Sequence, residues 1–233
     1  MWRSLASSSS VSELRALLEA GGAPNEHLAK LVRYGNAVLD ANRQFNLTGA
    51  RTPEEFAPHI LDSLTVLSHV RRSLADVGAG SGLPGIPLAI VTGVPVTLIE
   101  TTGKKARFLT QILTDLGLRG GVVAARAEVA AHDPALREHF ATGTARAVAS
   151  APTVAELLLP FIAVGGAAVL QRGAIDDRER SALADAALML GGMLESETQL
   201  EGDRRVIVVR KTAPTPTRFP RRTGVPEKRP LCF

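Results

Sequence analysis

The ten residues Asp76-Val77-Gly78-Ala79-Gly80-Ser81-Gly82-Leu83-Pro84-Gly85 decide how this chain folds. They join an apolar stretch at 74–77, which predicts a strand, to residues 84–91, which predict a helix. Glycine accepts a positive φ and lets a ligand approach the backbone, and a helix N-terminus offers N–H groups that have no partner within the helix. The stretch therefore predicts a ligand-binding loop at the carboxyl edge of a parallel sheet.

Strand and helix patterns alternate after this loop. Strands are expected at 94–99, 121–125, 146–149 and 167–171, and helices at 103–116, 154–163 and 178–190. Residues 194–200 and 206–211 predict a closing hairpin. The pattern indicates an α/β fold with a mostly parallel, Rossmann-like seven-stranded sheet and a terminal antiparallel hairpin.

The loop is preceded by a stretch of helical pattern. Helices are expected at 11–20, 26–43 and 52–70, after four consecutive serines at 7–10. We therefore expect a disordered N-terminus (1–10), a helical cap (11–70), a Rossmann-like domain (71–212) and a basic C-terminal tail (213–233).

Composition excludes several classes of protein. The 233 residues are 45% hydrophobic and 21% charged, which is typical of a globular domain and not of collagen or a disordered chain. Cys232 is the single cysteine, so no internal disulfide is expected. No secretory signal is recognisable, and prolines and glycines interrupt the long apolar stretches 83–99 and 151–171. A cytoplasmic protein without a membrane segment is expected.

The positive charge is concentrated at the C-terminal end. The net charge is +4, yet residues 204–233 hold nine basic residues and one acidic residue, and the preceding residues hold 18 basic and 22 acidic ones. Such a segment is either a solvated tail or an arm that binds phosphate groups, and charge alone leaves both readings open.

Two cofactors are compatible with the glycine-rich loop. The spacing Gly80-x-Gly82-x-x-Gly85, with Glu100 twenty residues later, matches the dinucleotide pattern. Asp76 favours S-adenosylmethionine, because its carboxylate can orient the loop or face a cationic cofactor but would repel a pyrophosphate. Pro84 and Pro87 favour it too, since they remove N–H donors that a pyrophosphate needs. The helical segment before the loop also favours S-adenosylmethionine.

Two further acidic residues follow predicted strands. The Glu100 carboxylate suits ribose hydroxyls, which both cofactors carry. Ala127 and Glu128 could read the adenine edge, but for Glu128 taken by itself the favoured explanation is an acid that complements the dipole at a helix N-terminus.

Several segments together resemble one known family. Residues 76–90 (DVGAGSGLPGIPLAI) resemble the cofactor segment of the RsmG/GidB family, the 16S ribosomal RNA guanine-527-N7-methyltransferases. Asn46-Leu47-Thr48, residues 59–64, Arg126-Ala127-Glu128, residues 146–149 and the tail 219–230 also match in order. The chain departs from the family at 141–145 and at Gln171-Arg172-Gly173, where members often carry an acidic or aromatic lead and Lys-Gly, respectively.

The resemblance implies a class I methyltransferase that methylates N7 of a guanine in 16S rRNA of the small subunit. It places Gly78, Leu83, Ala127, Glu128 and Arg146 on cofactor-contact positions, and Thr101, Thr102 and Gly103 on a further cofactor segment. The loop and the strand end add Asp76, Gly80, Gly82 and Glu100 to the expected cofactor site. A basic rim for RNA is expected from Lys104, Lys105, Arg221, Arg222, Lys228 and Arg229.

The chemistry agrees with the absence of a recognisable catalytic triad. Guanine N7 has an in-plane lone pair and no proton, so methylation needs positioning and no general base. Arg146, at the end of the fourth strand, is the candidate for positioning the target, unless it simply pairs with Glu128 or Asp76. His59 and Asp62 share a helix face. For these two residues and for Asn46, the sequence leaves open whether the role is functional or structural. No metal spacing is present, and a monomer is expected.

Two other classes of protein remain open at this point: an NAD(P)-dependent oxidoreductase on the same type of fold, and a non-catalytic RNA-binding or assembly factor. A methyltransferase for a small molecule is also compatible with the loop.

Overall fold

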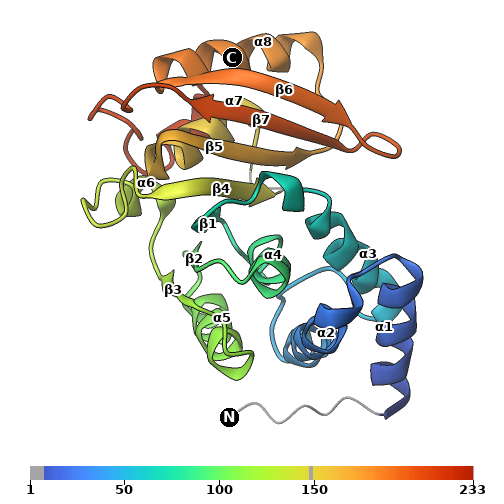
Figure 1. The fold of residues 1–233 in the computed structure, drawn as a ribbon. Coiled ribbons are helices and arrows are strands. Elements are labelled where there is room, and N and C mark those ends of the chain that lie inside the picture. Colours follow the sequence, from blue (N-terminus) through green and yellow to red (C-terminus); the bar gives the residue numbers. More distant parts are fainter. Residues whose placement is uncertain (1–7, 147–148, 233) are drawn as a thin grey trace.

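The structure is a computed structural model that describes residues 8–146 and 149–232. One seven-stranded sheet in the order β3-β2-β1-β4-β5-β7-β6 runs through it (Figure 1). Strands β1 to β5 are parallel, and β7 runs antiparallel to β5 and β6. The strands are β1 Leu74–Val77, β2 Val96–Ile99, β3 Gly120–Val123, β4 Phe140–Arg146, β5 Ile162–Arg172, β6 Gly192–Gln199 and β7 Arg205–Lys211. The expected α/β fold with a terminal hairpin is confirmed.

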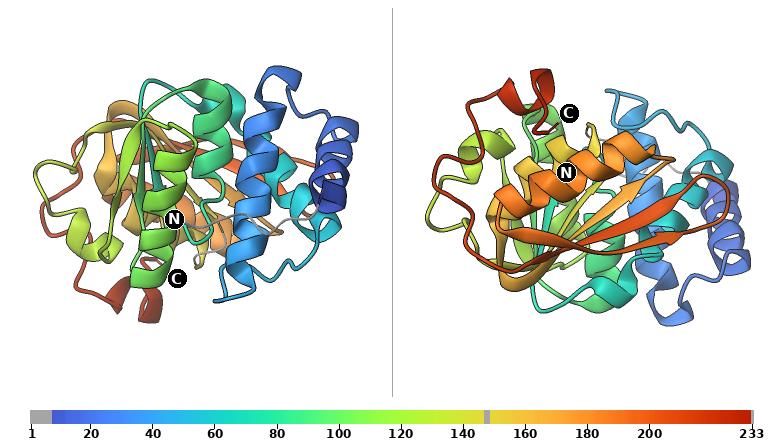
Figure 2. Two further views of the ribbon diagram at one scale, coloured as in Figure 1. Left: turned by 90° about the horizontal axis from the view of Figure 1, so that it is seen from below. Right: turned by 90° about the horizontal axis from the view of Figure 1, so that it is seen from above.

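The α-helices lie on both faces of the sheet (Figures 1 and 2). Helices α4 and α5 cover one face, with the three N-terminal helices packed outside α4, and α7 and α8 cover the other. The helices are α1 Ser8–Ala20, α2 Leu28–Asn42, α3 Pro53–Leu64, α4 Gly85–Thr92, α5 Gly103–Asp115, α6 Ala127–Ala130, α7 Ala151–Leu158, α8 Asp177–Met189 and α9 Val225–Lys228. Short 3-10 helices at Asn25–His27, Leu67–His69 and Leu159–Phe161 lie beside α2, α3 and β5.

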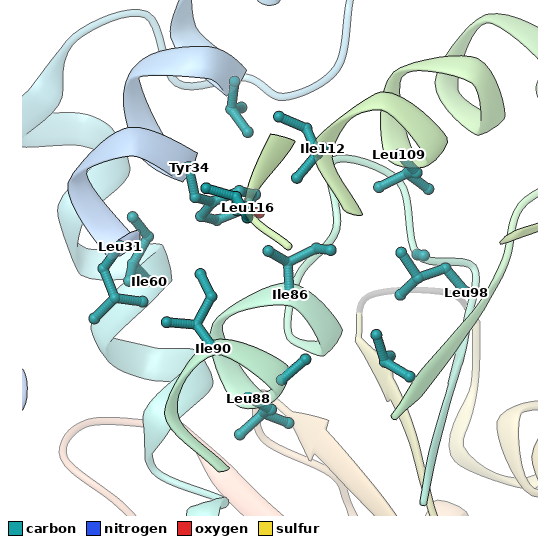
Figure 3. Close-up of a cluster of buried hydrophobic side chains, with 14 of the residues drawn as sticks. Leu31, Tyr34, Ile60, Ile86, Leu88, Ile90, Leu98, Leu109, Ile112 and Leu116 are labelled. Carbon is teal, nitrogen blue, oxygen red and sulfur yellow. The ribbon is translucent and has the colours of Figure 1, made fainter. Parts of the chain in front are cut away.

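The alternation of the strands divides the core into two clusters. Val169 belongs to the cluster under α1 to α5, and its neighbour Leu170 belongs to the cluster under α7 and α8. Val208 and Val209 of β7 divide in the same way. Because successive side chains of a strand point to opposite faces, a continuous apolar run serves both layers. Figure 3 shows the first cluster, to which the three N-terminal helices contribute.

The N-terminal helices also support the glycine-rich loop directly. Tyr34 of α2 is fully buried in the first cluster (Figure 3), and its hydroxyl donates to the carbonyl oxygen of Ser81 at 3.1 Å. Desolvation by burial raises the pKa of Tyr34, so the hydroxyl keeps its proton and remains a donor. The helical segment therefore shapes the loop at the end of β1.

The bounds of several expected elements differ from the structure: α3 ends at Leu64 and not near residue 70, and β5 begins at Ile162, inside the expected helix 154–163. Two further differences concern β4 and the N-terminus. The expected fourth strand at 146–149 is wrong: β4 spans Phe140–Arg146, and residues 147–148 lie outside the described part. The sequence pattern does not predict this strand, because Thr142 and Thr144 are polar residues in the middle of a sheet. They are tolerated there because the Thr144 hydroxyl bonds to Asp76 Oδ1 at 3.3 Å and the Thr142 hydroxyl to the His69 carbonyl at 3.2 Å. Of the expected disordered segment, residues 1–7 lie outside the description, whereas Ser8–Ser10 begin α1.

In the described residues no helix is long and apolar enough to span a membrane. The apolar stretches 83–99 and 151–171 form α4 with β2, and α7 with β5, respectively. Both are interior elements of the two layers.

Candidate active site

The loop between β1 and α4 is held by the side chain of Asp76. Its Oδ2 accepts from the Gly85 N–H at 2.9 Å, and the Thr144 hydroxyl donates to Oδ1. A Cβ on Gly85 would lie 2.6 Å from that same Oδ2, so only glycine lets the helix begin this close to the strand. Asp76 is fully buried, and desolvation raises its pKa to about 7 against the smaller opposing effect of these hydrogen bonds. Asp76 therefore orients the loop.

Glu100 ties the loop to the end of β2. One carboxylate oxygen accepts from the Gly80 N–H at 2.9 Å and the other from the Thr102 N–H at 2.7 Å. Each oxygen keeps a further acceptor position, because a carboxylate can accept about four hydrogen bonds. Glu100 therefore shapes the backbone and still presents acceptors to a ligand.

A pocket opens where β1, β2 and β3 end, and we call it the β1–β3 pocket. Of the residues expected to contact the cofactor, five line it: Gly78, Glu100, Thr101, Ala127 and Glu128. The other lining residues are Val77, Ile99, Ala125, Arg126, Ala149, Thr153, Leu157, Pro226 and Glu227. Gly78, with φ +72°, turns the chain at the pocket edge. Gly80, Gly82, Leu83 and Thr102 belong to the surrounding loops and Gly103 begins α5, and none of the five lines the pocket.

The charge of this lining distinguishes between the two cofactors. It carries three carboxylates, Glu100, Glu128 and Glu227, and one cation, Arg126. A pyrophosphate would meet net repulsion, whereas a cationic sulfonium or ammonium group would be attracted. The apolar lining, with Ile99 and Leu157, suits the flat face of an adenine. The net charge of the lining therefore favours S-adenosylmethionine over a dinucleotide.

The C-terminal segment forms part of the pocket wall. Gly224 donates its N–H to Glu128 Oε1 at 2.9 Å, and the Thr153 hydroxyl donates to the Pro226 carbonyl at 2.9 Å. Glu128 is therefore bonded to the backbone of the C-terminal segment, and it does more than complement a helix dipole. The segment 213–232 lies against the fold along α6 and α7 (Figure 2).

The six residues expected to contact RNA lie in different environments. The Arg221 guanidinium is engaged by Glu156 of α7, a residue with no exposed surface, at 2.7 Å. Arg222, Lys228, Arg229 and Lys104 are exposed, and Lys105 is half-buried. Glu156 was missed by the sequence analysis as a binding partner. The single available signal was an acidic residue inside the apolar run 151–163.

Lys105 and Asn46 lie in a wide groove between the α2–α3 connection and α5. Arg43, Arg51 and Lys105 make this groove basic. Asn46 does not cap the turn here. The Asn42 side chain organises it, since its Oδ1 accepts from the N–H groups of Leu47 and Thr48 at 2.8 and 3.1 Å.

Arg146 ends β4 and joins two residues of α3. Its guanidinium lies 2.8 Å from His59 Nδ1, 3.2 Å from the His59 carbonyl oxygen and 3.5 Å from Asp62 Oδ2. Burial lowers the pKa of His59, and the adjacent Arg146 charge lowers it further, so Nδ1 is available to accept from the guanidinium. The expected alternative, a pair with Glu128 or Asp76, is wrong: the carboxylate partner is Asp62.

Arg146 faces a second hollow at the ends of β4 and β5, which we call the β4–β5 pocket. It is lined by Asp62, Arg146, Gln171, Arg172, Gly173, Leu200, Arg204 and Arg205. The sequence analysis noted Gln171-Arg172-Gly173 only as a departure from the family and did not place Arg204 and Arg205 in a site. In the described residues, no group of three or more His, Cys, Asp or Glu side chains is arranged to hold a metal ion.

Comparisons with known proteins agree with this geometry. The family model described as rRNA small subunit methyltransferase G matches residues 27–208. The ribosomal RNA small subunit methyltransferase G of Rubrobacter xylanophilus is 42% identical over 93% of this chain and 89% of its own. That of Pelotomaculum thermopropionicum is 42% identical over 85% and 88%.

Solved structures share the fold at low identity. The Thermus thermophilus 16S rRNA N2 G1207 methyltransferase, solved with AdoMet and guanosine, aligns with a TM-score of 0.50 and 19% identity over 68% of this chain and 40% of its own. A geranyl diphosphate methyltransferase solved with SAM gives 0.52 and 13% over 77% and 90%.

The expected class I fold, the S-adenosylmethionine dependence and the activity as an rRNA methyltransferase are confirmed at the level of the family. The oxidoreductase and the non-catalytic RNA-binding factor are not favoured. This chain is an enzyme, and it belongs to the rRNA small subunit methyltransferase G family.

Proposed function

We propose that this enzyme transfers the methyl group of S-adenosylmethionine to N7 of a guanine in 16S rRNA. One observation carries the proposal. An acidic pocket at the ends of β1 to β3 lies next to an arginine-lined hollow at the ends of β4 and β5. The two meet at Ala149, which lines the first pocket while its carbonyl accepts from Arg172 of the second. A cationic cofactor and an anionic nucleic acid therefore each have a complementary place along one edge.

Within the β1–β3 pocket we assign a role to each group of residues. The remaining acceptor positions of Glu100 take the ribose hydroxyls, and Ala127 with Glu128 faces the adenine. Gly78 leaves room for the methionine part, and Thr101 lies beside the ribose. Gly80, Gly82, Leu83, Thr102 and Gly103 shape the loops, and Asp76 holds them without touching the cofactor. When bound, S-adenosylmethionine supplies a methyl group on a sulfonium sulfur.

The transfer needs no proton movement by the protein. The N7 lone pair forms the new bond to the methyl carbon while the carbon–sulfur bond breaks and its electron pair stays on sulfur. One positive charge leaves the sulfur and one appears on the purine, so the total charge at the site is conserved. The protein contributes alignment, which can account for much of the barrier reduction in such a reaction. Arg146 positions the target, and His59 and Asp62 hold the Arg146 guanidinium in place.

The exposed cations around the two pockets contact the RNA backbone in this proposal: Lys104, Lys105, Arg222, Lys228 and Arg229. Arg221 is reassigned as the residue that fastens the C-terminal segment, because its guanidinium is bound to Glu156. We place the reaction in the cytoplasm, where ribosomal subunits are assembled. The enzyme acts as a monomer in this proposal.

The test is the transfer of a radiolabelled methyl group to small subunits isolated from cells that lack this activity. The labelled RNA is then cleaved chemically at 7-methylguanine. One labelled guanine in 16S rRNA is the expected result. Label on another atom or on another RNA would overturn the assignment, and tight cofactor binding without transfer to any RNA would point to a small-molecule substrate.

A further inference from the structure

The β4–β5 pocket holds polar atoms whose hydrogen-bonding capacity is unmet. Gln171 is 6% exposed, and its side-chain amide donates to the Asp62 carbonyl at 2.7 Å and to the Thr65 hydroxyl at 3.2 Å. These contacts fix the orientation of the amide. The Gln171 Oε1 atom has no hydrogen-bond partner among the described residues.

Two arginines of the same lining have buried donors that lack an acceptor within residues 8–146 and 149–232. The Nε atoms of Arg172 and Arg205 are also buried and have no acceptor in the described part of the chain. Their terminal nitrogens are anchored outside the lining, Arg172 on Glu179 at 2.8 Å and Arg205 on Glu197 at 2.7 Å. Buried donors and acceptors are almost always satisfied, so three unmet atoms around one hollow indicate a ligand that brings both acceptors and a donor.

The charge of the hollow indicates the sign of the charge on that ligand. Its lining carries four guanidinium groups and one carboxylate, that of Asp62. Asp62 is shared, since Oδ1 lies 3.0 Å from Arg204 and Oδ2 lies 3.5 Å from Arg146. Arg204 has a second carboxylate, that of Glu201 at 3.6 Å, but Glu201 is exposed to solvent and lies outside the lining. The lining itself is therefore net positive, and planar guanidinium groups match phosphate oxygens well.

We propose that the β4–β5 pocket binds one phosphate–ribose unit of the RNA substrate. The phosphate oxygens accept from the arginines, and the ribose 2′-hydroxyl donates to Gln171 Oε1. A phosphate alone offers no donor at neutral pH that equals a hydroxyl, and a DNA unit lacks the 2′-hydroxyl, so the pocket selects RNA. The proposal rests on the proposed function and deepens it: a nucleotide beside the methylated guanine is held while Arg146, in the same lining, stays next to the reaction.

Arg204 is the residue to change, because its side chain is 46% exposed and its guanidinium pairs with the carboxylates of Asp62 and Glu201. The probe is a fluorescent fragment of 16S rRNA, and binding to the full chain is followed by anisotropy at several salt concentrations. For Arg204→Gln we expect affinity to fall about tenfold. The slope of log K against log salt should flatten by about 0.7, which corresponds to one lost phosphate contact. S-adenosylmethionine affinity stays unchanged.

Arg15→Gln is the matched control. Arg15 is an exposed arginine of α1 whose guanidinium also pairs with a nearby glutamate, Glu19 at 3.2 Å. It should leave both RNA affinity and salt slope unchanged. An Arg204→Gln variant that behaves like this control would overturn the phosphate contact, and equal thermal unfolding of the two variants excludes a folding effect.

The sugar contact has its own test. The wild type should bind the RNA fragment more tightly than DNA of the same sequence, and Gln171→Met should reduce that difference several-fold. A preference for RNA that is unchanged in a folded Gln171→Met chain would overturn this contact. These assays measure binding alone, so methyl transfer by the wild type, measured on the same fragment, reports separately on the proposed function.

Discussion

The Arg221 guanidinium holds the buried Glu156 carboxylate at two points. Nε lies 2.9 Å from Oε1 and Nη2 lies 2.7 Å from Oε2, and the Arg221 N–H donates to Oε1 at 2.8 Å. Another Nη2 bond reaches the Arg229 carbonyl at 2.7 Å. This pair fastens the C-terminal segment to α7, directly beside the two residues of that segment that line the β1–β3 pocket, Pro226 and Glu227. A segment whose sequence predicts a basic arm is therefore built into the wall of the β1–β3 pocket.

Arg221→Gln tests that anchor. The variant leaves Glu156 buried without a cationic partner, which is expected to lower the free energy of unfolding by about 3 kcal/mol. The affinity for S-adenosylmethionine should fall as well, because the pocket wall formed by Pro226 loosens. Urea denaturation and calorimetry measure the two effects. Arg222→Gln, at the exposed neighbouring position, is the control and should change neither quantity. Equal stability of the two variants would show that the pair does not hold the segment.

The exposed cations of the C-terminal segment should act on RNA alone. Reversing Arg222, Lys228 and Arg229 to Glu is expected to weaken RNA binding by at least about tenfold, and each lost phosphate contact should reduce the salt slope by about 0.7. Cofactor affinity stays the same, since none of the three residues lines the β1–β3 pocket. Filter binding at several salt concentrations checks the slope. A triple variant with the slope of the wild type would remove these residues from the RNA interface.

Gly78→Val should abolish cofactor binding. Gly78 lines the β1–β3 pocket at φ +72°, where a β-branched residue is strained and its side chain takes up space in the pocket. Gly93→Val is a matched control, because Gly93 also has a positive φ, +67°, and lies at the far end of α4 with no atom near its Cβ position. Both variants should lose about 1–3 kcal/mol of stability from backbone strain. Calorimetry with S-adenosylmethionine should separate them, and equal cofactor affinity in both would place the cofactor elsewhere.

The burial of Asp76 should make stability depend on pH. Burial raises its pKa from 3.8 to about 7, so the folded chain binds a proton that the unfolded chain has released. The contribution of Asp76 to the free energy of unfolding is therefore full below about pH 4 and declines until the pH passes about 7. Between pH 5 and pH 7 the decline amounts to about 2–3 kcal/mol.

Asp76→Asn removes this titration while keeping an acceptor for the Gly85 N–H. The stability of the variant relative to the wild type should therefore be higher at pH 8 than at pH 5. Denaturation in urea at both values measures the difference. Asp203→Asn, at an exposed position in the β6–β7 turn, should retain the pH profile of the wild type. If Asp76→Asn also retains it, the carboxylate is not titrating in this window.

Local sequence determined the arrangement of the elements and the position of the glycine-rich loop. Positive-φ glycines after a short apolar strand, and proline at the start of the next helix, act within a few residues, so they can be recognised without the fold. The alternation of strands and helices likewise predicted the parallel sheet with its hairpin. It failed at β4, because the threonines of that strand are satisfied by Asp76 and His69 from other parts of the chain.

Only the tertiary structure decided which charges meet. Arg221 and Glu156 are 65 residues apart, and Arg146 finds His59 and Asp62 on α3 because β4 lies beside β1 and α3 packs at its end. The β4–β5 pocket requires β7 to pair antiparallel with β5 in a register that places Arg205 opposite Arg172. Charged side chains are long and accept many partners, so sequence determines that a cation is present, whereas packing determines whether it meets a buried carboxylate or remains available to RNA.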